Sequence, residues 1–292
     1  MTELWIAIIL GVIEGVTEFL PISSTGHLLL AARWMDGWAD LTSTFWVRFV
    51  VFIQIGAIAA VVVYFRDRLR NLLAGRRIAE TGDSPMFAPD AGVQLPDPIR
   101  WHPILLILIA TVPVLIAGFL LHNVVEQYLE TPKVIATALI IGGVLMIAIE
   151  LLRPKPRTQT VEDITLGQAI FVGCVQILAA VFPGTSRSAA TIMGGLVAGL
   201  SRPAAAEFSF FLAIPAMCAA CGYALLKMLR SGGGLTMQQV LLLVVGTLVS
   251  FLVAFVVIAV FMRLIRKYSF IPFAIYRIIL GCVVLWLLRN VS

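Results

Sequence analysis

Two glutamates near the start of the chain are spaced so that they can act together. Glu14 and Glu18 are four residues apart, so on a helix both carboxylates lie on one face. Two like charges at this distance repel each other unless a cation lies between them or they share a proton. The pair therefore predicts either a bound divalent metal ion or a general acid and base.

A short polar run, PISSTGH, follows these glutamates and contains Ser23, Ser24, Thr25 and His27. Serine and threonine are good helix N-caps, and Ser23 by itself is best interpreted as a cap. A helix that starts here would offer free N–H groups to an anion, and a histidine can exchange a proton near neutral pH. The run predicts an anion site at a helix start.

A second polar run, PGTSRSAAT, contains Ser186, Arg187, Ser188 and Thr191. Arg187 has no acidic neighbour in the sequence, and its planar set of N–H donors suits a phosphate. A structural ion pair is the alternative. Together, the two runs resemble an acidic, histidine-bearing half-site and a cationic, hydroxyl-rich half-site. Such a pair is suited to a phosphate group with a metal ion.

The composition shows where these residues must lie. Of 292 residues, 60% are hydrophobic and 13% are charged, whereas soluble domains carry about 25% charged residues. This excludes a water-soluble globule. A helix crosses a membrane with about 20 apolar residues, and six runs are long enough: 45–65, 102–122, 132–152, 203–226, 237–262 and 270–288. The predicted fold class is an all-α polytopic integral membrane protein.

Two further apolar segments, 4–34 and 164–200, are each interrupted by one of the polar runs. Broken helices are tolerated in a membrane only where the freed backbone groups are buried in protein or line a wet cavity. At an offset of 162 residues, Gly11 falls on Gly173, Glu14 on Gln176, Pro21 on Pro183, Ser23 on Thr185 and Ser24 on Ser186. This indicates an internal repeat.

If each broken segment is a re-entrant hairpin, each half of the chain has one hairpin and three spans. Because three is odd, the second half must enter the membrane upside down. We therefore expect a single transmembrane domain of six full spans and two re-entrant hairpins. It would consist of an inverted-topology repeat, with the first repeat at 1–152 and the second at 163–292.

The lysines and arginines predict the orientation, because cytoplasmic loops carry the excess. Thirteen of the 21 fall on the side reached after the first span, including the loop 67–99, and five fall on the other side. The net charge of +5 thus reflects membrane topology, and no nucleic-acid partner is expected. Both termini should be extracytoplasmic.

Other polar residues inside the apolar runs include Gln54, Glu207, Ser209 and Arg277. Ionisable groups in a membrane are costly and usually have a partner or a function. These residues either surround the half-sites or have a purely structural role, and we expect an ion pair between Glu207 and Arg277.

Four segments of the sequence resemble the bacterial undecaprenyl-diphosphate phosphatase family, also called the bacitracin resistance family. They are EGVTEFLPISSTGH at 14–27, PGTSRSAAT at 183–191, EFSFFLAIP at 207–215 and SFIPFAIYR at 269–277, and the resemblance covers nearly the whole chain. It implies hydrolysis of undecaprenyl diphosphate to undecaprenyl phosphate and inorganic phosphate. That reaction recycles the lipid carrier of peptidoglycan synthesis and gives bacitracin resistance. It also implies a multi-pass protein of the bacterial inner membrane, with its active site towards the extracytoplasmic side.

The residues of the polar runs and the resemblance together define a candidate catalytic set and a candidate substrate-binding set. The catalytic set is Glu14, Glu18, Ser24, His27 and Arg187, and the substrate-binding set is Ser23, Thr25, Gln54, Ser186, Ser188, Thr191 and Arg277. A divalent cation, Mg²⁺ or Ca²⁺, would be held by Glu14 and Glu18. The nucleophile is Ser24, His27 or an activated water molecule.

The alternative function is a membrane transporter or flippase of a phosphorylated lipid, because inverted repeats and broken helices are typical of transporters. Transport of an anionic lipid requires Arg187 and the helix ends. It does not require clustered glutamate, serine and histidine, so this cluster favours the enzyme.

Overall fold

The computed structural model describes residues 2–35, 43–74, 101–125, 129, 131–230 and 235–289, and within them it contains helices and no β-strand. Six of the described helices are long and apolar enough to cross a membrane. They are α3 (Thr44–Tyr64), α5 (Pro103–Val124), α6 (Pro132–Leu152), α9 (Arg202–Arg230), α10 (Met237–Lys267) and α11 (Ile271–Arg289). The six predicted spans are confirmed, and the protein is a multi-pass helical membrane protein.

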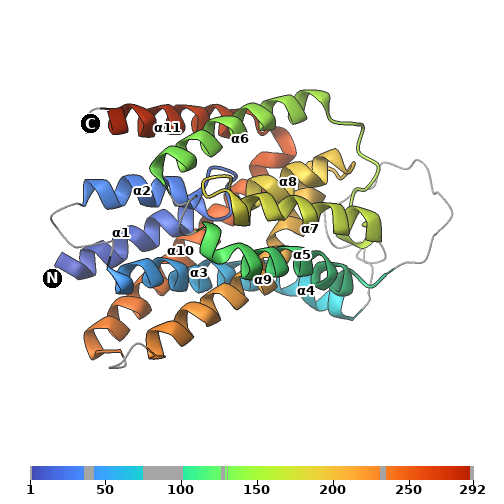
Figure 1. Cartoon of the computed structure of the whole chain (residues 1–292). Helices are drawn as coiled ribbons and strands as arrows, with labels where there is room; N and C mark the ends of the chain where they lie inside the picture. Colours follow the sequence, from blue (N-terminus) through green and yellow to red (C-terminus); the bar gives the residue numbers. More distant parts are fainter. Residues whose placement is uncertain are drawn as a thin grey trace.

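The two broken segments form two pairs of shorter helices. The first pair is α1 (Thr2–Thr17) and α2 (Ser24–Trp34), and the second is α7 (Leu166–Val181) and α8 (Arg187–Val197). Each interruption falls on the polar run that the sequence indicated. Figure 1 shows each pair doubling back on itself, with the two connecting loops meeting in the middle of the bundle.

Glycines bring the first helix of each pair against a helix from the other half of the chain. A Cβ on Gly11 of α1 would lie 2.7 Å from the Gly246 carbonyl oxygen of α10, and one on Gly173 of α7 would clash with the Ala110 carbonyl of α5. Small residues at these positions allow close backbone approach. The two halves of the chain are therefore interleaved, so that residues from both surround the central loops.

The last spans of the two halves pack against each other through a reciprocal pair of contacts. A Cβ on Gly143 of α6 would lie 2.8 Å from the Ala274 carbonyl oxygen of α11, and one on Gly281 of α11 would lie 2.8 Å from the Ala136 carbonyl oxygen of α6. Position 143 faces 274 while 136 faces 281, so the two helices run antiparallel. The contact fixes α11 beside the first half of the chain.

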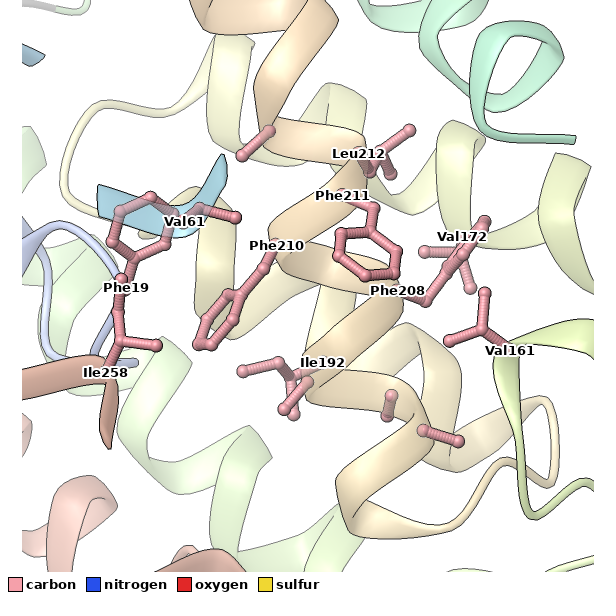
Figure 2. Close-up of a cluster of buried hydrophobic side chains, with 14 of the residues drawn as sticks. Phe19, Val61, Val161, Val172, Ile192, Phe208, Phe210, Phe211, Leu212 and Ile258 are labelled. Atoms are coloured by element: carbon pink, nitrogen blue, oxygen red, sulfur yellow. The ribbon is translucent and has the colours of Figure 1, made fainter. Parts of the chain in front are cut away.

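Aromatic packing holds the first loop against the bundle. The ring of Phe19 packs edge-on against that of Phe210 on α9, with ring centroids 5.0 Å apart, and both side chains are fully buried. Figure 2 shows Phe19 at one side of the apolar cluster that Phe208, Phe210 and Phe211 form along α9. The loop is therefore anchored by burial of a large apolar side chain immediately beside Glu18.

The first turn of α1 and the last turn of α11 lie at one end of the bundle, and the short helix α4 (Arg66–Leu73) lies at the other (Figure 1). At the α4 end, Arg68 donates to Glu207 of α9 at 2.5 Å and to both oxygens of Glu162 at 2.5 and 2.6 Å. Burial alone would lower the pKa of Arg68, but the two carboxylates raise it above the ordinary arginine value. The loop 67–99 is described only as far as residue 74.

The predicted ion pair between Glu207 and Arg277 is wrong. Glu207 lies in the second turn of α9, where Arg68 reaches it from the α4 end of the bundle. Arg277 instead donates to the carbonyl oxygens of Gly184 and Thr185, at 3.2 and 2.8 Å. Helix α11 places Arg277 against the second loop, which has free carbonyl groups, so backbone oxygens take the place of a carboxylate.

Candidate active site

The two loops are joined directly by side chains from opposite halves of the chain. Arg187 Nη2 lies 2.9 Å from Glu18 Oε1, although the residues are 169 positions apart. Ser188 Oγ donates to the Leu20 carbonyl oxygen at 2.9 Å. The acidic and the cationic half-sites predicted from the sequence therefore lie in contact.

The same glutamate also accepts a hydrogen bond from the start of α2. Ser24 Oγ donates to Glu18 Oε2 at 2.9 Å, so Ser24, Glu18 and Arg187 form one chain of polar contacts. The side chains of Glu18 and Arg187 are only 9% and 14% exposed. A hydroxyl within hydrogen-bond reach of a carboxylate has the geometry of a nucleophile with its base.

Helix α9 supports the cationic side of the site. Arg187 Nη1 lies 3.4 Å from the Ser209 carbonyl oxygen, and its guanidinium lies 5.7 Å from the centroid of the Phe19 ring. The Ser209 hydroxyl is hydrogen-bonded to Thr191 Oγ1 at 2.5 Å. These contacts hold α8 and its arginine in place. Ser209 thus supports Arg187 and lies beside the half-sites, as expected from the sequence.

The serine that directly precedes the second helix of each pair, α2 or α8, has an unusual backbone conformation. Ser23 has a φ of 72° and Ser186 a φ of 70°, values that residues other than glycine seldom adopt. Ser23 Oγ accepts from the Gly26 amide at 3.4 Å and Ser186 Oγ from the Ala189 amide at 3.3 Å. Both serines are N-caps, as the sequence predicted for Ser23. The free N–H groups at the starts of α2 and α8 lie next to the contacts between Ser24, Glu18 and Arg187.

These two caps correct the register of the repeat within the loops. Ser23 occupies the same structural place as Ser186, so the offset there is 163 residues and not 162. The second loop has one more residue between its proline and its cap, Gly184 and Thr185 against Ile22 alone. Ser24, the first residue of α2, consequently matches Arg187, the first residue of α8. Each half of the chain therefore places one functional side chain, Ser24 or Arg187, at the first residue of the second helix of its pair.

Glu14 is fully buried on α1, and neither of its carboxylate oxygens has a hydrogen-bond partner. Gln176, its counterpart on α7, is also fully buried without a partner. An unpartnered buried carboxylate is costly, so oxygen atoms are free here for a cation. No group of three or more potential metal ligands is found within the described ranges.

His27 lies on α2 and is held by two hydrogen bonds. Its Nδ1 lies 2.8 Å from the Ser23 carbonyl oxygen, and its Nε2 lies 2.7 Å from the Tyr276 hydroxyl of α11. Tyr276 was missed in the sequence analysis, although it lies within one of the motifs quoted there. Its only signal was its place beside Arg277.

The remaining predicted residues differ in their burial and in their contacts. Ser186 Oγ and Ser188 Oγ are 3.0 Å apart at the start of α8, and Thr25 is exposed in the first turn of α2. Gln54 is partly buried on α3. Arg277 is fully buried and supports the backbone of the second loop, so the structure places it behind the site.

The chain also matches a known protein family and several named relatives. Residues 7–283 match the family described as bacitracin resistance protein BacA. Relatives named undecaprenyl-diphosphatase occur in Sorangium cellulosum, with 43% identity over 96% of this chain and 85% of the relative, and in Koribacter versatilis, with 39% over 99% and 100%. A protein of the same name in Clostridium tetani is 44% identical over 96% of this chain and 94% of its own length.

Proposed function

We propose that this chain, which belongs to the bacitracin resistance protein BacA family, is an undecaprenyl-diphosphatase. It would hydrolyse undecaprenyl diphosphate to undecaprenyl phosphate and inorganic phosphate, and so recycle the carrier lipid and give bacitracin resistance. One observation carries the proposal: Ser24, Glu18 and Arg187 from two distant loops form a single hydrogen-bonded chain.

The terminal phosphate would bind between the N-termini of α2 and α8. Arg187 offers a planar set of donors, and the free N–H groups of both helices favour an anion. On binding, Arg187 would turn from Glu18 to the phosphate. That exchange frees the carboxylate to act as a base towards Ser24, and it places positive charge where the transition state carries negative charge.

We propose Ser24 as the nucleophile. Its oxygen bonds to the terminal phosphorus while its proton passes to Glu18, and the bond from phosphorus to the bridging oxygen breaks to release undecaprenyl phosphate. Water then hydrolyses the phosphoserine, giving inorganic phosphate and the free hydroxyl. Ser24 is favoured over His27 because its hydroxyl already donates to a carboxylate, whereas both ring nitrogens of His27 are in other hydrogen bonds.

A divalent cation, Mg²⁺ or Ca²⁺, fits the acidic side of this site. Glu14 has two buried oxygens without partners, and such ions bind through one or two carboxylates together with phosphate oxygens and water. Glu14, with Glu18, would hold the ion. When bound, the ion would offset the charge of the diphosphate.

We further propose that the chain lies in the bacterial cytoplasmic membrane as an inverted repeat with two re-entrant hairpins. The end of the bundle that carries both termini would face outwards, and the arginine-rich α4 end inwards. The site would open to the extracytoplasmic side. A 55-carbon tail is costly to withdraw from the bilayer, at about 0.8 kcal/mol per CH₂ group, so the polar site is brought to the lipid.

The test is phosphate release from undecaprenyl diphosphate by the purified protein in detergent. We expect release that a chelator lowers by about a hundredfold or more, in line with the charge stabilisation that a metal ion supplies, and that Mg²⁺ or Ca²⁺ restores. Undecaprenyl phosphate should release none. Chelator-insensitive release would overturn the metal proposal alone. If the folded protein releases no phosphate, the phosphatase proposal fails and lipid transport becomes the better account.

A further inference from the structure

Tyr276 and His27 form a close pair although they are 249 residues apart. The Tyr276 hydroxyl lies 2.7 Å from His27 Nε2. The two rings are stacked, with centroids 5.6 Å apart and planes 10° apart. Tyr276 lies on α11 and His27 on α2, so this pair links the last span of the chain to the helix that follows the first loop.

The hydrogen bonds define which ring nitrogen carries the proton. The Ser23 carbonyl oxygen can only accept, so the bond at Nδ1 requires a proton on Nδ1. In the neutral ring, Nε2 is then an acceptor, and the Tyr276 hydroxyl donates to it. The histidine is thus fixed at both nitrogens, with its orientation set by Tyr276 on one side and by the loop backbone on the other.

The hydrogen bond from His27 Nδ1 to the Ser23 carbonyl oxygen affects the position of Ser24, the proposed nucleophile. The carbonyl group of Ser23 belongs to the peptide unit that joins Ser23 to Ser24, and Ser23 has the strained φ of 72°. A strained backbone persists only where surrounding contacts hold it. The bond from His27 Nδ1 to this carbonyl is such a contact, and it helps to direct Ser24 towards Glu18.

The next residue of α11 acts on the other loop. Arg277 donates to the carbonyl oxygens of Gly184 and Thr185, just before the cap Ser186. Two consecutive residues of one helix therefore hold the backbones of both loops, one directly and one through His27. The close packing of α11 on α6 keeps this helix in place.

We propose that Tyr276 is a positioning residue of the reaction, acting through His27 to orient the loop that carries Ser24. This inference rests on the proposed function for its role in catalysis, but the hydrogen bond itself is independent of it. Its hydroxyl fixes the tautomer and orientation of the histidine.

The first test is a double-mutant cycle on phosphate release. Tyr276→Phe keeps the stacked ring and removes the hydroxyl, and we expect kcat to fall about tenfold with little change in KM, as for the loss of one hydrogen bond. In a His27→Gln background the same substitution should have no further effect. Tyr268→Phe, an exposed tyrosine outside the site, is the matched control. An equal loss in both backgrounds, or no loss in either, would overturn the inference.

A second measurement does not depend on activity. The chain has three histidines, so ¹⁵N spectra of histidine-labelled protein can be assigned by comparison with His27→Gln. Tyr276→Phe should shift the Nε2 resonance of His27 and leave the other two histidines unchanged. An unshifted resonance would contradict the pairing. If the shift occurs but wild-type protein releases no phosphate, the proposed function has failed while the pairing stands.

Discussion

Arg187→Ala should lower kcat/KM for undecaprenyl diphosphate by about a thousandfold to ten-thousandfold, the effect of removing a key charge-stabilising donor in phosphoryl transfer. The substitution removes the guanidinium that lies 2.9 Å from Glu18 and that would hold the phosphate. Arg187→Lys should recover little, because an ammonium group lacks the planar pair of donors. Steady-state phosphate release measures both variants.

The control for this prediction is Arg70→Ala, which removes an exposed arginine at the α4 end and should leave activity unchanged. Because Glu18 loses its cationic partner in Arg187→Ala, some loss of stability is expected. Thermal unfolding in detergent separates that loss from the loss of catalysis. Activity within tenfold of wild type in folded Arg187→Ala would contradict a phosphate-binding role for the residue.

Ser24→Ala should abolish turnover, with at least a thousandfold loss of kcat, since a missing nucleophile is not replaced by a neighbouring group. Its neighbour provides a matched comparison. Ser23→Ala removes only a cap and should cost about 1 kcal/mol of stability with a much smaller effect on rate. Rapid-quench experiments with labelled substrate should also show a phosphoserine at position 24 in the wild type.

Two outcomes would redirect this part of the mechanism. Substantial turnover in Ser24→Ala would point to His27 or an activated water molecule as the nucleophile. A large loss in Ser23→Ala at unchanged stability would mean that the roles of the two serines are reversed. Either result leaves the ion pair between the loops intact and changes only the attacking atom.

Much of the architecture was predictable because it follows from local patterns. Runs of apolar residues specify spans by length alone, and polar turn residues in the middle of an apolar segment specify a break. The grouping of glutamate, serine, histidine and arginine at the two breaks predicted the half-sites. The structure brings Glu18, Ser24 and Arg187 together, as such a site requires.

The errors and omissions concern contacts between distant segments. Glu207 and Arg277 have complementary charges, but the partners of a buried charge depend on which helix ends meet, and Arg68 lies closer to Glu207. One extra residue in the second loop shifted the register of the caps, a change that a fixed offset cannot represent. Tyr276 was missed because a tyrosine in an apolar run carries no local sign of its partner.

Glu18 and Arg187 are expected to act as one unit, and a double-mutant cycle measures this directly. Phosphate release from undecaprenyl diphosphate should be measured for wild type, Glu18→Gln, Arg187→Ala and the double variant, all checked for folding. If the two loops form one reaction centre, the double variant should be no more than about tenfold worse than the more damaged single variant. Losses that multiply to about a millionfold would show that the two residues act independently, and the two loops would then not form one reaction centre.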